Sequence, residues 1–495
     1  MRAPLADLST RLAGLSGRNR ALAYGVLGAF GGLGHAPVAI PAFTVLALVM
    51  VFATRPWLLP RKAAAWAGWA FGAGYFAVTL HWIVEPFLVD VWRHGWMAPF
   101  ALVLMCGGLA LFWAAAFGVA GWRRSGLALV AAWAVAEFAR ANVFTGFPWG
   151  MMVTTGVEVW LYQGAAWLGP HGLTLVLFLA ALATVSGPQS VRWVAAGALA
   201  GTAIAPVSPA EAPPDDAAVV RVVQPNARQD LKWDPDMIPV FLERKMQASA
   251  AAPPADLVIW PEVALPMWLR EGGDILSEAA ARSGGADLLI GAQRWRNGDV
   301  LNTLAHVGPT GDVMALYDKH HLVPFGEYMP GAWLFDRFAI FGLAANQLAG
   351  FTPGPGAAVI DIPGLGPVQP LICYESIFAH EVGRGVTRPR LIAVVTNDAW
   401  FGQVGGPAQH LAQAQARAIE QGVPVARSAN TGISAIIDAR GQIIASLPLG
   451  VDGYADASLP AARTATPYAR WGDWLFLGLL TFVVLLHLLG RRVRS

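Results

Sequence analysis

Long apolar stretches fill the first 207 residues of the chain and return after residue 470. A helix that crosses a bilayer needs about 20 predominantly apolar residues with few charges. By that measure we expect about eight membrane-spanning helices, seven before the middle of the chain and one near its end. They cover residues 21–37, 38–54, 63–84, 97–122, 126–144, 160–186, 191–207 and 471–489.

Between residues 208 and 470 the apolar runs shorten to strand length, and Pro, Asp, Glu and Arg become common. Short runs rich in β-branched residues are typical of strands, and runs that are apolar throughout are typical of sheets covered on both faces. Strands are expected at 218–224, 256–260, 287–291, 304–307, 313–317, 369–373, 391–396 and 433–438, and helices at 236–251, 274–283 and 408–422. This alternation predicts an α/β layered fold with its site at strand ends.

The pattern therefore divides the chain into three parts. Residues 1–207 are predicted to form an N-terminal membrane domain, residues 208–470 a water-soluble α/β domain, and residues 471–495 a C-terminal transmembrane helix with a basic tail.

The composition agrees with a membrane protein. The chain is 55% hydrophobic and only 13% charged, whereas a soluble domain has about 25% charged residues. The net charge of +2 is not gathered into one basic face, so no nucleic-acid partner is expected. Two cysteines exclude a disulfide framework and a four-thiolate zinc site, and Cys106, inside an apolar stretch, is interpreted as a buried, inert thiol.

The cations predict an orientation, because Lys and Arg in short loops stay on the cytoplasmic side of a membrane. With eight spans, the short-loop cations fall on one side of the membrane, except for Arg93. The cations on that side are Arg2, Arg11, Arg18, Arg20, Arg55, Arg61, Lys62, Arg123, Arg124, Arg192, Arg491, Arg492 and Arg494. Both termini are therefore expected in the cytoplasm, and the 208–470 domain in the periplasm of a bacterium with an outer membrane. The N-terminus has no clean Ala-x-Ala-like cleavage site and is interpreted as an uncleaved first span.

Three polar residues follow strand-like runs and together form a set suited to acyl transfer: Cys373, Glu262 and Lys319. A thiol is mostly protonated at neutral pH, so a nucleophilic cysteine needs a base, for which Glu262 is the candidate. Lys319 and the backbone N–H of Tyr374 could stabilise the oxyanion that forms. Taken singly, each residue also fits a solvated Glu, a surface Lys or an inert buried Cys, and only their joint occurrence favours catalysis.

These residues resemble a known family. Trp260-Pro-Glu262, Lys319 and Cys373-Tyr-Glu375 are similar to the Glu-Lys-Cys triad of the nitrilase (carbon–nitrogen hydrolase) superfamily, whose fold is a four-layer α-β-β-α sandwich. The runs 319–328, 397–402 and 427–434, in a domain flanked by membrane helices, resemble the apolipoprotein N-acyltransferase family more specifically.

The resemblance implies a two-step reaction without a cofactor. Cys373 would take an acyl chain from a membrane phospholipid, typically phosphatidylethanolamine, as a thioester, and the α-amine of the diacylglyceryl-cysteine of an apolipoprotein would receive it. Glu262 would be the general base and Lys319 would stabilise both tetrahedral intermediates. The supporting residues of the family map to Trp233, Asn302, Glu327, Tyr374 and Glu375. The expected partners are thus the phospholipid, diacylated apolipoproteins and the bilayer, and the protein is expected to be a monomer.

Several alternatives stay open. Glu327 and Glu375 either anchor Lys319 and position the amine, or are surface carboxylates. The mostly apolar segment 329–351 is either an arm that dips into the membrane or a helix packed on the core. Glu137 and Arg140 are either a functional intramembrane pair or a local i, i+3 pair.

Other functions were compared with acyl transfer to an amine. The same triad would serve a membrane-anchored amidase or nitrilase that uses water as acceptor. A transporter is disfavoured because the apolar stretches lack paired charges and clear broken-helix signatures. No metal is expected, since His320, His321 and His410 have no ligand partners at usable spacing.

Overall fold

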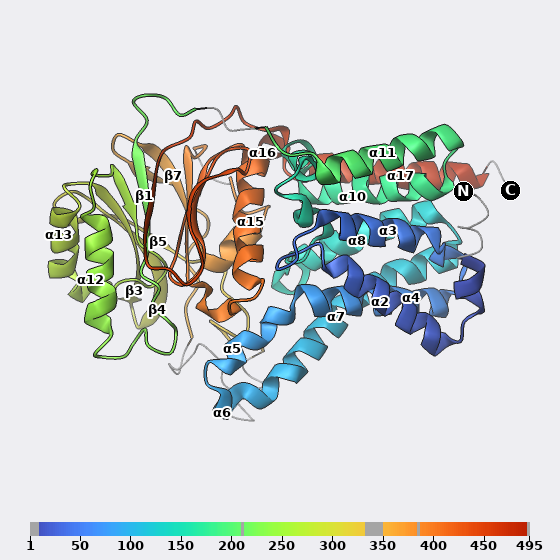
Figure 1. Cartoon of the computed structure of the whole chain (residues 1–495), viewed down its shortest axis with the longest axis horizontal. Helices are drawn as coiled ribbons and strands as arrows, with labels where there is room; N and C mark the ends of the chain where they lie inside the picture. The colour runs from blue at the N-terminus through green and yellow to red at the C-terminus, as the bar shows by residue number, and fades with distance from the viewer. Residues whose placement is uncertain (1–8, 209–211, 332–349, 384–386, 493–495) are drawn as a thin grey trace. The chain divides into compact units, whose positions relative to one another are not determined.

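The computed structural model describes residues 9–208, 212–331, 350–383 and 387–492. The chain forms two compact units, which are described separately (Figure 1). The first unit spans residues 1–84, 92–208 and 466–495, and the second spans residues 85–91 and 209–465. The short segment 85–91, which the sequence pattern assigns to the membrane domain, thus groups with the second unit.

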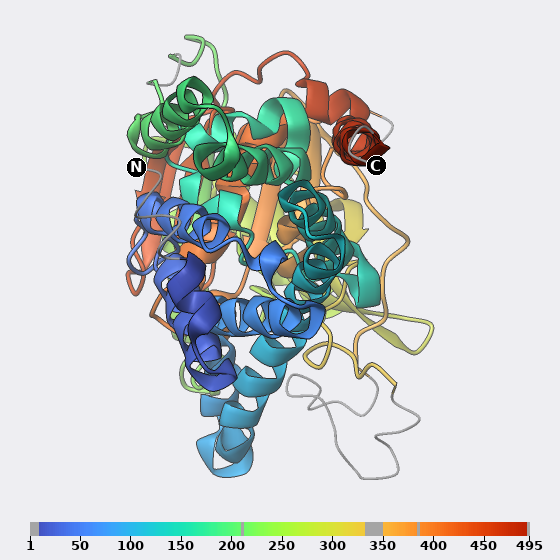
Figure 2. The same cartoon turned by 90° about the vertical axis from the view of Figure 1, so that its right-hand side faces the viewer.

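The first unit is built of α-helices, which Figure 2 shows from one end. A helix lies in each of the stretches predicted to span the membrane. The main helices are α2 (Gly17–Gly32), α3 (Pro41–Ala53), α4 (Arg61–Thr79), α7 (Ala98–Arg123), α8 (Gly126–Asn142), α10 (Ala165–Ser186), α11 (Gln189–Ile204) and α17 (Trp474–Arg492). Short helical turns connect them at η1 (Pro56–Leu58), η2 (His81–Val84), α6 (Val91–His94), η3 (Gly95–Met97), η4 (Val143–Thr145), η5 (Met152–Gly156), α9 (Trp160–Gln163) and α16 (Pro467–Trp471).

Within the described residues, 4 segments are long and apolar enough to cross a membrane: Pro41–Leu58, Val91–Arg123, Gly126–Thr145 and Ala165–Ser186. Trp474–Leu489 is apolar but shorter. The expectation of about eight spans is therefore not confirmed. Helix α2 has 16 residues, and at about 1.5 Å per residue it is shorter than the roughly 30 Å hydrocarbon core of a bilayer.

Glu137 and Arg140 form a buried ion pair on α8. Arg140 Nη2 lies 2.7 Å from Glu137 Oε2, and Trp113 Nε1 donates to Glu137 Oε1 at 2.6 Å. Arg140 Nη1 also donates to the carbonyl oxygens of Phe147 and Trp149, at 2.5 and 2.8 Å. The pair is thus a local i, i+3 contact that ties the segment after α8 to the helix, which favours the second of the two interpretations.

The second unit contains two six-stranded sheets. In spatial order, the first sheet consists of β12 (Gly453–Ser458), β1 (Val219–Gln224), β2 (Leu257–Ile259), β3 (Asp287–Arg296), β4 (Asp299–Val307) and β5 (Val313–Asp318). The second sheet consists of β11 (Ile443–Leu447), β10 (Ser434–Ile437), β9 (Val425–Ala429), β8 (Leu391–Thr396), β7 (Gly366–Ile372) and β6 (Ile360–Ile362). The centres of both sheets are parallel, since β1, β2 and β3 run together and so do β7, β8 and β9.

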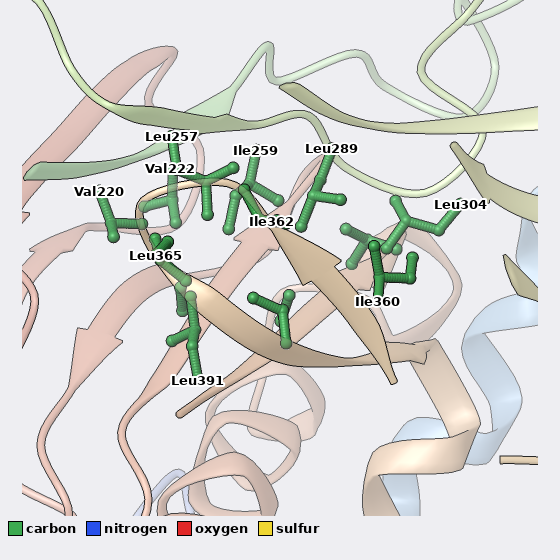
Figure 3. Close-up of a cluster of buried hydrophobic side chains, with 14 of the residues drawn as sticks. Val220, Val222, Leu257, Ile259, Leu289, Leu304, Ile360, Ile362, Leu365 and Leu391 are labelled. Carbon is green, nitrogen blue, oxygen red and sulfur yellow. The ribbon is translucent and has the colours of Figure 1, made fainter. Parts of the chain in front are cut away.

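The two sheets pack face to face over an apolar core. Figure 3 shows Val222, Ile259 and Leu289 of the first sheet pointing toward Ile362 and Leu391 of the second. These side chains are at most 1% exposed. Their close packing fixes the spacing of the sheets, so residues at the strand ends of one sheet are held against those of the other.

Helices cover the outer face of each sheet (Figure 1). Helices α12 (Ile238–Ser249) and α13 (Gly273–Arg282) bury Met246 and Leu276 against Val258 and Leu288 of the first sheet. Helix α15 (Gly406–Gln421) buries Leu411 among the strands of the second. The unit therefore has the layer order α-β-β-α, as the resemblance implied.

Four strands were not predicted: β6, β9, β11 and β12. The short helical segments of this unit are α5 (Glu85–Leu88), η6 (Leu269–Glu271), η8 (Cys373–Ile377) and η9 (Asp398–Phe401). Most of the apolar segment 329–351, including Phe338 and Phe341, lies outside the described residues, so neither interpretation of that segment is tested.

Candidate active site

Glu262 lies in the turn that follows β2 and is 7% exposed. The next residue, Val263, has φ +48°, a conformation that is unusual for a β-branched residue. The turn packs so closely on Gly291 of β3 that a Cβ there would lie 2.1 Å from the carbonyl oxygen of Pro261. Both oxygens of the Glu262 carboxylate accept hydrogen bonds: Oε1 from Asn302 Nδ2 at 2.8 Å, and Oε2 from the backbone N–H of Asn397 at 2.9 Å.

Lys319 follows β5 and is 1% exposed. Its Nζ lies 2.9 Å from Glu327 Oε1 and 3.6 Å from Glu262 Oε1. Asn302 on β4 contacts Glu262, Lys319 and Glu327. Its backbone carbonyl oxygen accepts from the backbone N–H of Lys319 at 2.8 Å, and its side-chain Nδ2, which donates to Glu262, also lies 3.4 Å from Glu327 Oε1. Burial alone would lower the pKa of Lys319, but the charges of Glu327 and Glu262 raise it above its usual value, so the ammonium stays charged.

Cys373 is the first residue after β7 and the first of η8. Its φ is +54°, and the side chain is 5% exposed. A left-handed residue at this point turns the chain sharply, and such strain in a non-glycine residue is typical of functional sites.

The Cys373 thiol is neutral at rest. Burial raises its pKa, the negative charge of Glu262 adds to this, and the nearby charge of Lys319 and a hydrogen bond with Thr396 oppose it. The balance is a raised pKa, so the thiolate would form only as a base removes the proton. Both charged residues of the predicted triad therefore act electrostatically on this thiol.

Glu375 is fully buried and holds the backbone around the site. Its Oε2 accepts from the Ile372 N–H at 2.7 Å and from Tyr317 Oη at 2.9 Å. Its Oε1 accepts from the N–H groups of His320 and His321, at 2.7 and 3.2 Å. Glu375 thus fastens the segment after β5 to the end of β7, whereas Glu327 makes the direct contact with Lys319. Neither residue is a surface carboxylate.

Tyr374 and Trp233 differ in exposure. Tyr374 is 6% exposed and packs edge-on against the rings of His321 and Phe378. Trp233 is 46% exposed and lines a small pocket together with Lys232 and Val263. Since Val263 follows Glu262, this pocket lies beside the turn that carries the candidate base.

Some residues at the site were not predicted. Asn397 supplies a backbone N–H to Glu262, and Gly291 makes room for the Glu262 turn. Asn397 belongs to the run 397–402 quoted for the family resemblance, so a signal was present, but nothing in a single sequence indicates which backbone N–H groups meet a carboxylate. Among the described residues, no group of His, Cys, Asp and Glu could hold a metal ion.

Known protein families match both units of the chain. The sequence pattern of the carbon–nitrogen hydrolase family matches residues 219–468, which defines the second unit as a domain of that class. The pattern of the apolipoprotein N-acyltransferase N-terminal domain matches residues 26–183 of the helical unit. The chain belongs to the apolipoprotein N-acyltransferase family.

Individual relatives cover nearly the whole chain. An apolipoprotein N-acyltransferase from Caulobacter vibrioides is 38% identical over 502 residues, with 90% of this chain and 91% of the relative covered. One from Rhodopseudomonas palustris is 35% identical over 490 residues, with the same coverage of 90% and 91%. Among solved structures, an amidase of the nitrilase superfamily from Nesterenkonia is 19% identical with a TM-score of 0.39, covering 52% of this chain and 95% of the amidase.

Proposed function

We propose that the protein transfers an acyl chain from a membrane phospholipid to the α-amine of the diacylglyceryl-cysteine of apolipoproteins, through a thioester on Cys373. The observation that carries the proposal is a buried acid–base set in a member of this family. Glu262 and Lys319 are both hydrogen-bonded to Asn302, and the charges of both affect the pKa of the Cys373 thiol. The relatives are named apolipoprotein N-acyltransferases, which favours an amine over water as acceptor.

In the first half-reaction, Glu262 takes the thiol proton while Sγ of Cys373 attacks the ester carbonyl carbon of the phospholipid. The negative charge moves to the carbonyl oxygen, where the Lys319 ammonium and the Tyr374 N–H stabilise it. The ester C–O bond then breaks, and the leaving oxygen takes the proton from Glu262. The products are a lysophospholipid and an acyl thioester on Cys373.

In the second half-reaction, the neutral α-amine of the lipoprotein attacks the thioester carbonyl. Glu262 removes a proton from the attacking nitrogen, and Lys319 again stabilises the oxyanion. The C–S bond breaks, and the leaving thiolate regains a proton from Glu262. Asn302 Oδ1 is buried and has no hydrogen-bond partner among the described residues, so it is available to accept an N–H of the incoming amine.

The helical unit supports a bilayer substrate. A soluble amide hydrolase has no use for four membrane-spanning segments, whereas an acyl chain in a bilayer must be taken at its surface. We propose that the remaining helices bring the spans to eight, with both termini in the cytoplasm and the catalytic domain in the periplasm. The pattern of Lys and Arg in the short loops supports this orientation. We also propose phosphatidylethanolamine as the donor and a monomeric enzyme.

The acceptor is tested by following discharge of the acyl-enzyme. Wild-type protein is loaded with phosphatidylethanolamine of one defined acyl chain, freed of excess lipid, and mixed with a synthetic diacylated lipopeptide or with buffer alone. Faster loss of the acyl mass with lipopeptide, with one N-acylated lipopeptide formed per adduct lost, is expected. Loss at the same rate in buffer would instead indicate a hydrolase, and the proposed acceptor would be wrong.

A further inference from the structure

A buried polar cluster lies behind Cys373 and contacts its backbone. Its members are Ser376 on η8, Asp398 at the start of η9, His410 on α15 and Arg427 on β9, and all four are fully buried. Residues from η9, α15 and β9 thus gather behind η8, the element that carries the residue proposed as nucleophile. None of the four takes part in the proton transfers described above.

The cluster holds the carbonyl group of Cys373 from two sides. Ser376 Oγ donates to this carbonyl oxygen at 2.8 Å. His410 Nε2 lies 3.3 Å from the same oxygen and 3.0 Å from Ser376 Oγ. The carbonyl is therefore fixed in a polar recess that contains no solvent-exposed side chain.

Buried charges hold the His410 ring in place. Its Nδ1 lies 2.9 Å from Asp398 Oδ1, and Asp398 in turn accepts from Thr396 Oγ1 at 2.9 Å and pairs with Arg427. Burial and the charge of Arg427 lower the pKa of His410, whereas its contacts with Asp398 and with the Cys373 carbonyl oxygen oppose this shift. Burial alone would raise the pKa of Asp398, but Arg427 and His410 lower it to about 2, so the carboxylate is ionised. A rotation of the imidazole would break these contacts among fully buried polar groups, which is costly.

The geometry of a peptide bond links this recess to the reaction. In a planar trans peptide, the C=O of one residue and the N–H of the next point in opposite directions. With the Cys373 carbonyl bound in the recess, the Tyr374 N–H points away from the cluster. The left-handed conformation of Cys373, with φ +54°, is unfavourable for an L-residue, so the peptide has a reason to flip when those contacts are removed.

We propose that His410, together with Ser376, is a positioning residue that locks the Cys373–Tyr374 peptide, so that the Tyr374 N–H faces the carbonyl oxygen of the substrate as an oxyanion donor. The proposal rests on the proposed function and concerns the same site. It gives the Asp398–His410–Arg427 cluster a role in both half-reactions, because an oxyanion forms in each.

The test compares two reactions of the same thiol in a His410→Leu variant. Acylation by phosphatidylethanolamine passes through an oxyanion, whereas alkylation by iodoacetamide displaces iodide without one. Complete loss of one oxyanion donor lowers a rate by roughly 10²–10³-fold. The loss here should be smaller, because a Cys373–Tyr374 peptide that is free to flip still points the Tyr374 N–H at the substrate for part of the time. We therefore expect single-turnover acylation to fall about 10- to 100-fold, with an unchanged lipid concentration at half-maximal rate and an unchanged alkylation rate.

His306→Leu is the matched control, because His306 on β4 is also buried and bound to a carboxylate, with Nε2 2.7 Å from Asp287 Oδ1. It should leave both rates unchanged. Ser376→Ala is a second, smaller change that should reproduce the selective loss of acylation. Acylation of His410→Leu at the wild-type rate would overturn the proposal, and so would a parallel fall in alkylation, which would indicate a structural role. A wild-type protein that is alkylated but never acylated would instead overturn the proposed function.

Discussion

Gly291 should be essential to the site although it makes no chemical contribution. It lies on β3 directly against the turn that carries Glu262. A Cβ at this position would lie 2.1 Å from the carbonyl oxygen of Pro261, 2.8 Å from Cα of Glu262 and 2.8 Å from N of Val263. All three atoms belong to the backbone, so no side chain can rotate away to relieve the clash.

The size of the effect follows from these distances. To restore an ordinary contact of 3.4 Å from 2.1 Å, the turn must retreat by about 1.3 Å. It cannot do so freely, because the carbonyl oxygen of Gly291 accepts from the N–H groups of Ala264 and Leu265, at 2.7 and 3.0 Å. A misplacement of about 1 Å can cost roughly 10²-fold in rate, and overpacking of this kind costs about 1–3 kcal/mol of stability.

We therefore expect Gly291→Ala to form the acyl-enzyme about 100-fold more slowly than wild type, as followed by the intact mass of the protein after rapid mixing with phosphatidylethanolamine in detergent. The matched control is Gly273→Ala on α13, where a Cβ would meet nothing within 4 Å. It should acylate normally. If Gly291→Ala forms the acyl-enzyme at the wild-type rate while remaining folded, the position of the Glu262 turn does not limit the reaction, and the assignment of Glu262 as base is refuted.

Three further predictions concern charged groups. Lys319→Met should lower the rate of acylation at least about 10²-fold, while the folded protein can still be purified. Acylation at the wild-type rate would contradict the role of Lys319. Burial alone would lower the pKa of His320, but hydrogen bonds with Glu375 and Glu381 and their negative charges raise it to about 10. The charged ring therefore stabilises the folded protein fully below pH 6.5, and this stabilisation is lost as the pH rises toward 10. Thermal melting in detergent should therefore show a smaller decrease between these pH values in His320→Gln than in wild type, and equal decreases would argue against the ion pairs. Arg140→Met leaves Glu137 buried and unpaired, which should cost about 3–5 kcal/mol; an unchanged melting temperature would refute the structural role of that pair.

The fold of the catalytic unit was largely predictable because several of its central strands are short, mostly apolar runs. Strands β2 and β8 are buried along their whole length, and β7 is buried from Val368 onward, so they stand out in the sequence as short hydrophobic runs. By contrast, β11 is partly exposed along its length, and β6 has only 3 residues. Edge strands of this kind have no hydrophobic pattern to reveal them.

The helical unit shows the limit of hydropathy. The positions of its helices could be predicted, but their ability to cross a membrane could not, because residues such as Arg61 and Lys62 lie inside helix α4 and not before it. A sliding average over an apolar stretch does not fix where a helix begins.

The candidate site was predictable only in part, for a physical reason. Glu262, Lys319 and Cys373 each follow a strand, and strand ends meet at one edge of a layered fold. The roles of Asn302 and Glu375 as contacts between elements depend on which backbone groups come together in space. The sequence marks His410 only as a residue without metal-ligand partners at usable spacing. Its contacts with Asp398 and Arg427 follow no motif, although all three residues are buried in one cluster.

The central claim is that Cys373 carries the acyl chain. The most direct measurement is peptide mass spectrometry of the wild-type protein after incubation with phosphatidylethanolamine of one defined acyl chain. The account predicts one acyl group, released by hydroxylamine, on the peptide that contains Cys373, none on Cys106, and none in Cys373→Ala, with one lysophospholipid formed per adduct. Acylation of the Cys373→Ala variant at another residue, or lipid turnover by that variant, would contradict the account.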